Sequence, residues 1–273
     1  MSELERHATN LVDVVYGNER LTYDDPTENW FEATKVYRAS MAWDAPGVSR
    51  LTRSPALQMI ATRAGKRFDD LPTVPLPAPL TPTMSLQEAA DQRRSVHRFT
   101  GQEISFPQLS TLLDFSYGVT HRPEGLRRRV PSGGALYPID IYVFASHVTD
   151  LEHGVYHYDP YRTCLAHLGD FADERLSSAL LQEEMVSTSS ATVVLSASFW
   201  RNRFKYGPRS GRFVFLDAGH IMQNLSLIAP AIDLGGRPFG GFIDDELSEL
   251  IGYHNGVDTA PLYAFVAGVP GDR

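Results

Sequence analysis

The sequence predicts an α+β fold in which helices pack on a sheet. Runs of β-branched and aromatic residues that are typical of strands lie at residues 139–145, 191–199 and 261–267. Segments with helix start signals lie between them, and the two kinds do not alternate in the regular βαβ order of a parallel sheet. The 273 residues, 42% of them hydrophobic, are enough for one large domain with an extension.

The composition narrows the class of protein. A net charge of –8 argues against nucleic acid, or an anionic membrane surface, as the main partner. No run approaches 18 apolar residues and the first ten residues are polar, so we expect neither a transmembrane helix nor a signal peptide. A single cysteine, Cys164, leaves no internal disulfide and fits a reducing compartment. We therefore expect a cytoplasmic protein.

Prolines divide the chain. The segment "DDLPTVPLPAPLTPT", residues 69–83, carries five prolines and is predicted to be an extended linker. Residues 1–68 contain one helical stretch near 54–67 and no complete core, so we expect an arm that packs on another part of the protein. The aromatic residues of this arm are Tyr16, Tyr23, Trp30, Phe31, Tyr37 and Trp43. Residues 84–273 form the predicted main domain.

After the linker, each element has its own signal. "SLQE" is a capping box, which predicts a helix from Ser85 to about Arg93. "SFPQ" has the same form at Ser105, with proline in the first turn, and that helix is expected to end at Gly118. The later elements are expected in this order: strands at 139–145, 154–158 and 163–167, a helix at 173–184, a strand at 191–199, a buried helix at 212–228 interrupted near Pro230 and closed by Gly235, a helix at 244–251 with an acidic start, and a strand at 261–267.

Four potential metal ligands lie within fifteen residues, namely His153, His157, Cys164 and His167. However, "GVYHYDP" predicts a strand, and residues four apart on a strand lie about 13 Å apart. The first two histidines therefore cannot bind one ion. We expect solvated hairpin histidines and no metal site.

The stretch "RRSVHRF", residues 93–99, holds three arginines in six residues. Cations are favourable at the end of a helix, which is one interpretation of the cluster. The other is a phosphate site, because the guanidinium groups of Arg93 and Arg94 and the hydroxyl of Ser95 suit a dianionic phosphate. The residues alone leave the two interpretations open.

Two predicted turns, "PSGGALYP" at 131–138 and "RPFGGF" at 237–242, each contain two consecutive glycines, whose backbone amides no side chain covers. Glycine permits tight turns and lets a backbone approach a flat ligand closely. Ordinary turns are the alternative. Together with the arginine–serine cluster, the two turns match a phosphorylated planar cofactor, which needs amide donors for its ring and cations for its phosphate.

The basic stretch "RNRFKYGPRSGR", residues 201–212, contains adjacent Lys205 and Tyr206. An ammonium group stabilises a neighbouring phenolate, so this pair is a candidate acid–base element. The alternative is a solvated basic loop with a packed tyrosine, and the stretch taken alone favours that alternative.

Six motifs, in this order, resemble the nitroreductase superfamily and, within it, the SagB-type dehydrogenases that act on azolines in modified peptides. The motifs are "RRSVHRF" (93–99), "PSGGALYP" (131–138), "GVYHYDP" (154–160), "KYGPRSGR" (205–212), "DAGHIMQNL" (217–225) and "RPFGGF" (237–242). The resemblance covers residues 85–269. It implies a nitroreductase-like fold with a mostly antiparallel sheet, and an FMN-dependent homodimer with each flavin at the subunit interface.

The resemblance also implies which residues hold the phosphate and ribityl chain of FMN, namely Arg93, Arg94 and Ser95. His97 would contact the flavin at a position where the family usually has arginine or lysine. Arg209 or Arg212 is the candidate for a further phosphate-binding cation.

A four-residue turn is implied to reach the flavin, usually from the other subunit, and consists of Pro131, Ser132, Gly133 and Gly134. The amides of Gly240 and Gly241 would meet the ring edge near N5 and O4. The catalytic pair of the azoline dehydrogenases falls on Lys205 and Tyr206.

The function implied is an FMN-dependent dehydrogenase that oxidises thiazoline or oxazoline rings to azoles in a ribosomal or nonribosomal peptide. A cyclodehydratase or a carrier protein would be a partner, and the arm would pack on the dimer. The alternatives are an NAD(P)H-dependent nitro- or quinone reductase, another peptide dehydrogenation, and a flavin-binding scaffold subunit without enzymatic activity.

Overall fold

The computed structural model describes residues 26–39, 46–62, 65–122 and 125–271. The chain divides into two compact units, Met1–Asp44 and Ala45–Arg273. In the first, α2 (Pro26–Ala33) is the described helix. Three aromatic residues of the predicted arm, Tyr16, Tyr23 and Trp43, lie outside the described residues. The arm's packing on a dimer stays a prediction. None of the helices in the described ranges is long and apolar enough to cross a membrane.

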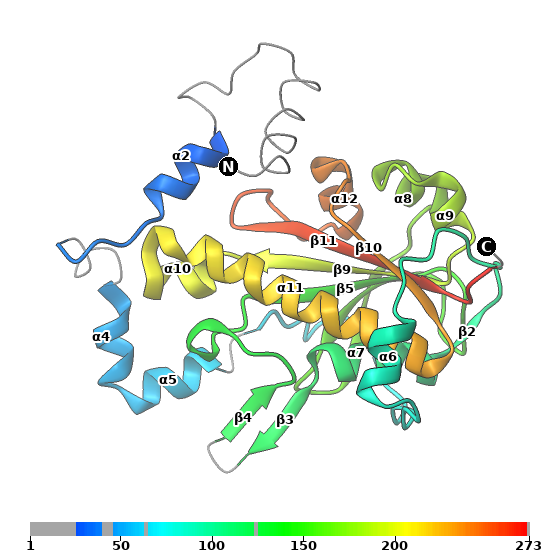
Figure 1. Ribbon diagram of the computed structural model, residues 1–273, viewed down its shortest axis with the longest axis horizontal. Helices are drawn as coiled ribbons and strands as arrows, with labels where there is room; N and C mark the ends of the chain where they lie inside the picture. The colour runs from blue at the N-terminus through cyan, green and yellow to red at the C-terminus, as the bar shows by residue number, and fades with distance from the viewer. Residues whose placement is uncertain (1–25, 40–45, 63–64, 123–124, 272–273) are drawn as a thin grey trace, which may run out of the picture. The chain divides into compact units, whose positions relative to one another are not determined.

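The second unit is built on a seven-stranded sheet in which every neighbouring pair is antiparallel (Figure 1). In sheet order the strands are β1 (Thr73–Pro75), β8 (Cys164–Gly169), β7 (Gly154–Asp159), β5 (Ile139–Ala145), β9 (Ala191–Ser198), β11 (Thr259–Gly268) and β10 (Gly235–Phe239). The predicted α+β fold with a mostly antiparallel sheet is confirmed.

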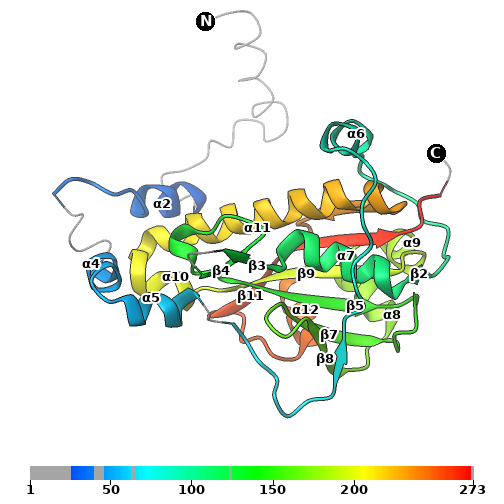
Figure 2. The same ribbon diagram turned by 90° about the horizontal axis from the view of Figure 1, so that it is seen from below.

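Helices cover both faces of this sheet, as Figure 2 shows for α11 and α12. On one face lie α7 (Phe106–Tyr117) and α11 (Ser210–Ile228). On the other lie α8 (Asp173–Ala179), α9 (Glu183–Ser187) and α12 (Asp244–Ile251). Strand β5 serves both cores, because successive side chains of a strand point to opposite faces. Ile141 and Val143 join the first core, and Tyr142 and Phe144 join the second.

The two predicted capping boxes are confirmed. Helix α6 (Leu86–Gln92) begins after Ser85, whose hydroxyl accepts from the amide of Glu88 at 3.2 Å. Helix α7 begins after Ser105 in the same way and ends at Gly118. Each cap satisfies amides that the first turn of a helix leaves without a partner. These signals are local, and so they could be recognised without the rest of the fold.

Several segments differ from the sequence-based expectation. The single helix expected at 173–184 is split into α8 and α9 around Leu181, which has a φ of +55°. Two stretches for which a loop was the alternative interpretation, 201–212 and 237–242, contain part of a regular element, namely α10 (Trp200–Tyr206) and β10. Strand β10 was missed because its sequence, GGRPF, has low strand propensity. Its glycine is required by the sheet, since a Cβ on Gly236 would stand 2.0 Å from the ring of Phe265.

Some smaller elements complete the second unit. Helix α5 (Pro55–Thr62) matches the expected helical stretch, whereas α4 (Pro46–Thr52) before it was not expected. The chain also forms a hairpin of β3 (Val119–Arg122) and β4 (Gly125–Arg128) and a short parallel pair of β2 (Ile104–Ser105) and β6 (Val148–Thr149). Within the proline-rich segment, β1 occupies the sheet edge, where proline is tolerated.

The expectation of solvated hairpin histidines is wrong for His157. Its side chain is buried and lies between the rings of Phe68 and Tyr142, with centroid distances of 5.0 Å and 5.3 Å. The reason is that β7 is an interior strand of the sheet and the segment at Phe68 covers it. Across the described ranges, no group of three or more histidine, cysteine or acidic residues could hold a metal ion.

Candidate functional site

The turn at residues 131–137 is strained. Gly134 has a φ of +67°, and two residues with side chains, Ala135 and Tyr137, have φ values of +54° and +47°. Left-handed residues other than glycine are uncommon, and the surrounding structure must hold them in place. Here the Ser132 hydroxyl accepts from the amide of Tyr137 at 2.9 Å, and the phenol of Tyr137 accepts from the amide of Arg128 at 3.2 Å. Such strained turns cluster at functional sites.

The turn meets the Lys205–Tyr206 pair. A methyl group on Gly134 would clash with the Lys205 ammonium and stand 2.7 Å from the Tyr206 phenol oxygen. A methyl on Gly133 would stand 3.3 Å from the ring of Phe213, which packs 4.7 Å from the Tyr206 ring. Gly134 therefore lies directly against the ends of the Lys205 and Tyr206 side chains, and its positive φ favours glycine, whereas Gly133 lies against Phe213. The structure brings together two motifs that lie some seventy residues apart in the sequence.

A buried carboxylate lies under the same turn. Asp217 of α11 is 3% exposed, and burial raises its pKa to about 6, although the Ser132 hydroxyl, His220 and the Gly133 amide oppose that shift. Asp217 thus ties the turn to α11. Sequence reasoning assigned it no role, and its only signal was its place in the motif "DAGHIMQNL".

The arginine cluster faces a cavity of about 650 Å³. Arg93 and Arg94 line it with Ser226 at the far end of α11 and with residues of the α11–β10 connection. Ser95 pairs with Gly236 of β10, so this segment runs beside that strand. The cavity is within the volume range of small-molecule sites. Its lining also contains Asp91 and Asp233, so its charge is mixed.

His97 and the second Gly-Gly turn lie further along the same segments. The Nδ1 atom of His97 is 2.8 Å from a guanidinium nitrogen of Arg237. Because a guanidinium only donates, Nδ1 is the acceptor, and Nε2 carries the proton of the neutral ring. Gly240 and Gly241 follow β10 and are exposed, and a Cβ on either would meet nothing within 4 Å. Nothing in the described chain requires these two glycines.

The predicted site residues therefore form two groups along α11. The turn contacts the helix near Phe213, and the arginine cavity meets it at Ser226. Thirteen residues of helix separate these contacts by about 20 Å. Arg209 and Arg212 lie at the turn end of α11, so within one chain they are far from Arg93.

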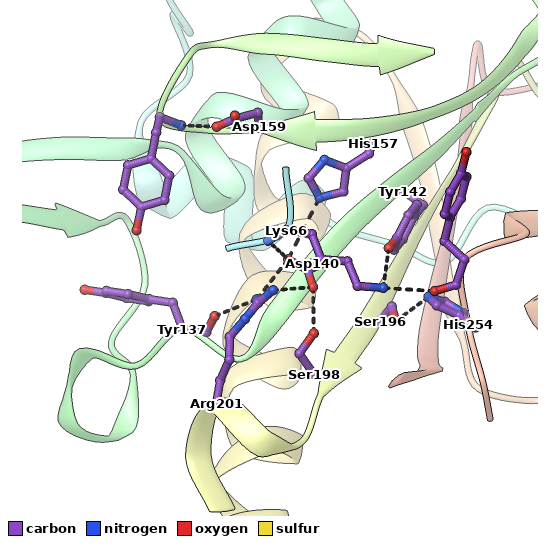
Figure 3. A network of polar contacts seen from close by, with 12 residues as sticks. Lys66, Tyr137, Asp140, Tyr142, His157, Asp159, Ser196, Ser198, Arg201 and His254 are labelled. Atoms are coloured by element: carbon purple, nitrogen blue, oxygen red, sulfur yellow. Dashed lines mark hydrogen bonds and ion pairs between the residues drawn. The ribbon is translucent and has the colours of Figure 1, made fainter. Parts of the chain in front are cut away.

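A buried polar network contacts the end of the turn at Tyr137 (Figure 3). Asp140 of β5 receives two hydrogen bonds from Arg201 of α10, at 2.8 Å and 2.7 Å, and one from Ser198 at 2.8 Å. Burial opposes ionisation of Asp140, but the Arg201 charge holds the pKa of this carboxyl well below its usual range. No motif of the sequence indicated Asp140, because its partner lies 61 residues away.

The network continues toward Lys66, whose ammonium donates to the phenol of Tyr142 and to the carbonyl of Tyr253, both at 3.1 Å (Figure 3). His254 lies beside it, 2.8 Å from the hydroxyl of Ser196. Burial, together with the Lys66 charge, lowers the pKa of His254 to about 4, so its ring is neutral at pH 7. These groups hold the segment at Lys66 onto the sheet.

An apolar groove of about 630 Å³ lies between α4, α5 and α10, the helix that carries the Lys205–Tyr206 pair. Its apolar lining includes Leu51, Leu57, Ile60, Trp200 and Phe204. Helix α4 touches α10 closely, because a Cβ on Gly47 would stand 2.6 Å from the Lys205 Cα atom.

The fold and the motifs define a class of protein. The model of the Nitroreductase family matches residues 90–268, and the chain belongs to this family. It is 32% identical over 180 residues to "Putative nitroreductase MJ1384" of Methanocaldococcus jannaschii, covering 66% of this chain and 90% of that protein.

Its relatives include the Microcin B17-processing protein McbC of Escherichia coli, with 27% identity over 157 residues, 55% of this chain and 58% of that protein. The structure of the E. coli microcin synthetase McbBCD with truncated pro-MccB17 bound shares the fold, with a TM-score of 0.60 and 19% identity. That match covers 100% of this chain and 98% of the other.

Proposed function

We propose that the protein is an FMN-dependent dehydrogenase that oxidises thiazoline or oxazoline rings to azoles in a peptide. The observation that carries the proposal is the contact of Lys205 and Tyr206 with the strained Gly134 turn. A plain NAD(P)H-linked reductase gives this pair no special role. The likeness to a microcin-processing protein supports a peptide substrate, and so does the apolar groove beside α10.

The chain's donor groups fit FMN. Arg93, Arg94 and Ser95 would hold the phosphate and ribityl chain, since the two arginines line an open cavity. The amides of Gly240 and Gly241 are exposed and have no side chains to block a ring. His97 would offer its Nε2 proton to the ring, because Arg237 occupies Nδ1.

When bound, FMN supplies a two-electron hydride acceptor, and dioxygen serves as the final oxidant. The chain supplies the proton chemistry. Oxidation of an azoline removes one hydride and one proton, and Tyr206 in its phenolate form would accept the proton at its oxygen, which leaves a neutral phenol. The Lys205 ammonium, 5.0 Å from the centroid of the Tyr206 ring, would stabilise the phenolate before it takes the proton. The strained turn fixes both groups in one place.

A homodimer is part of this proposal. Helix α10 exposes Trp200 and Phe204, and α11 exposes Leu216, which is unusual for large apolar side chains of neighbouring helices. A second copy would cover them and bring its turn to the flavin held by the first copy. A cyclodehydratase or a carrier protein is the proposed further partner, which would deliver the azoline peptide.

The test is the absorption spectrum of the purified protein, followed by anaerobic mixing with an azoline-containing peptide. We expect flavin bands that bleach without NAD(P)H, and a peptide that has lost two hydrogens per ring by mass spectrometry. Bleaching by NAD(P)H alone, with the peptide unchanged, would reject the proposal.

The second candidate is an NAD(P)H-dependent nitro- or quinone reductase, which the 32% identity to MJ1384 favours. In that case a nitroaromatic would sustain NAD(P)H consumption, and Tyr206→Phe would leave the rate unchanged. A colourless protein that FMN does not bind would instead favour a scaffold subunit without enzymatic activity. If the enzyme catalyses another dehydrogenation, mass spectrometry would locate the loss of two hydrogens in a peptide residue outside the azoline rings.

A further inference from the structure

The Asp140–Arg201 ion pair joins the two elements that form the contact of the Lys205–Tyr206 pair with the turn. Asp140 is the second residue of β5, six residues after Gly134, and Arg201 lies in the first turn of α10. The guanidinium and the carboxylate meet through two parallel hydrogen bonds, at 2.8 Å and 2.7 Å. A bidentate pair of this kind, or fork, fixes the orientation of the guanidinium group relative to the carboxylate as well as the distance between them.

Both partners are secluded from water, with side-chain exposures of 13% for Arg201 and 5% for Asp140. Two further groups form hydrogen bonds with members of the pair. Ser198 donates to the carboxylate at 2.8 Å, and Arg201 reaches the carbonyl of Tyr137 at 3.4 Å. The pair therefore connects β5, β9, α10 and the end of the strained turn (Figure 3).

Helix α10 is short, and its other contacts include the close packing of α4 against Lys205 and the hydrogen bond from the indole of Trp200 to Asp258. It is seven residues long and begins without a side-chain cap. Trp200 and Phe204 are 55% and 45% exposed, and the buried amide of Asn202 has no hydrogen-bond partner. Lys205 follows Arg201 by four residues, so the two side chains lie on the same face of the helix. A rotation of α10 about its axis would carry Lys205 and Tyr206 away from Gly134.

We propose that Asp140 is a positioning residue for Lys205 and Tyr206, which acts by fixing Arg201 and so the rotation of α10 against the turn. This inference rests on the proposed function only where it concerns rate. Asp140 itself touches neither member of the pair. It acts through Arg201 and through the backbone at Tyr137.

The first arm of the test reads the position of Tyr206 without any activity. The full-length protein is labelled with 3-fluorotyrosine, and the Tyr206 signal is identified as the fluorine resonance that disappears in Tyr206→Phe. We expect Asp140→Asn to move this resonance. The matched control is Asp114→Asn, which breaks the 2.6 Å ion pair between α7 and Arg129 and should leave the resonance in place.

The second arm is kinetic. With an azoline peptide, Asp140→Asn should lower kcat about 30-fold and change KM less than about threefold, as loss of an interaction made in the transition state requires. In a Tyr206→Phe background the same substitution should change kcat less than about threefold, because the two residues act as one unit. Asp114→Asn should stay within about threefold of the unsubstituted enzyme in either background.

A Tyr206 resonance that stays in place in Asp140→Asn would overturn the proposal, as would equal kcat losses in both backgrounds. If Asp140→Asn fails to fold, Arg201→Lys keeps the charge but loses the fork, and an unmoved resonance there would overturn it too. A moved resonance in a protein that does not oxidise azolines would reject the proposed function and keep this inference.

Discussion

The two regions that hold the predicted site residues differ in how completely the chain fills them. In the turn region, residues 131–137 pack directly against Lys205, Tyr206 and Phe213, and a methyl group on Gly134 would displace the end of the Lys205 side chain. In the open region, residues 93–97 and 235–241, two arginines line a cavity of about 650 Å³, and Gly240 and Gly241 face open space. The first region is organised by the chain itself. The second is left open, and we propose that FMN and a second copy of the chain occupy it.

The largest effect is expected from Tyr206→Phe, which removes the proposed proton acceptor of the turn region. Positioned acid–base groups contribute about 10²- to 10⁴-fold to a rate, so kcat for azoline oxidation should fall by that factor. Flavin content should stay unchanged, because the open region is intact. Stopped-flow bleaching and the flavin absorbance measure the two quantities. Retention of full activity would remove Tyr206 from the mechanism.

Gly134→Ala should have the next largest effect. The new methyl group displaces the Lys205 ammonium, and alanine is strained at a φ of +67°, so we expect about 100-fold lower activity and about 1 kcal/mol lower stability. The matched substitution in the open region, Gly240→Ala, meets no neighbour and should leave the melting temperature unchanged. Equal melting temperatures for the two variants would contradict the difference between the regions.

Arg93→Ala tests the open region by itself. Loss of one charge-assisted contact to a phosphate should weaken FMN binding about 10- to 100-fold, with no loss of stability in the flavin-free protein. Arg98→Ala is the control, since Arg98 belongs to the same motif but its side chain is 73% exposed and lies 4.0 Å from the carboxylate of Glu184. Fluorescence titration with FMN would show the contrast, and equal affinities for both variants would remove Arg93 from the phosphate site.

The smallest expected effect is the contribution of Asp217 to the pH dependence of the free energy of unfolding. Its pKa is about 6 in the folded protein and 3.8 ordinarily, so the folded state binds the proton more tightly than the unfolded chain. This contribution to stability is complete below pH 3.8 and is lost as the pH rises through 6. Between pH 5 and pH 8, the free energy of unfolding should fall by about 1.4 kcal/mol more in the natural protein than in Asp217→Asn.

Urea unfolding at the two pH values measures this difference. Asp170→Asn, whose side chain is 90% exposed in the natural protein, is the control. Its free energy of unfolding should fall between the two pH values by the same amount as that of the natural protein. If the free energy of unfolding of Asp217→Asn falls by that same amount, the buried carboxylate does not titrate as described.

The sequence predicted most of the fold because its strongest signals are local. The capping boxes at Ser85 and Ser105 and the β-branched run of β9 determine their own elements. Strand β10 and helix α10 were missed because distant partners stabilise them, namely β11 for the strand and Asp140 for the helix. A local pattern contains no information about a partner 61 residues away.

In the candidate site too, features with a local sequence signal could be predicted, and features that depend on distant partners could not. The turn and the Lys205–Tyr206 pair were each visible as motifs, but their contact at Gly134 exists only in the folded chain. Asp217 and Asp140 carried no signal of their own, since single buried carboxylates look like ordinary polar residues in a sequence. The roles of the FMN-binding residues remain predictions that binding experiments must test.

The most direct test of the central claim is anaerobic mixing of the flavin-loaded protein with an azoline peptide, comparing the natural protein with Tyr206→Phe. The account predicts bleaching of the flavin without NAD(P)H in the natural protein, and bleaching at least about 100-fold slower in the variant. Equal bleaching rates, or no bleaching until NAD(P)H is added, would contradict it.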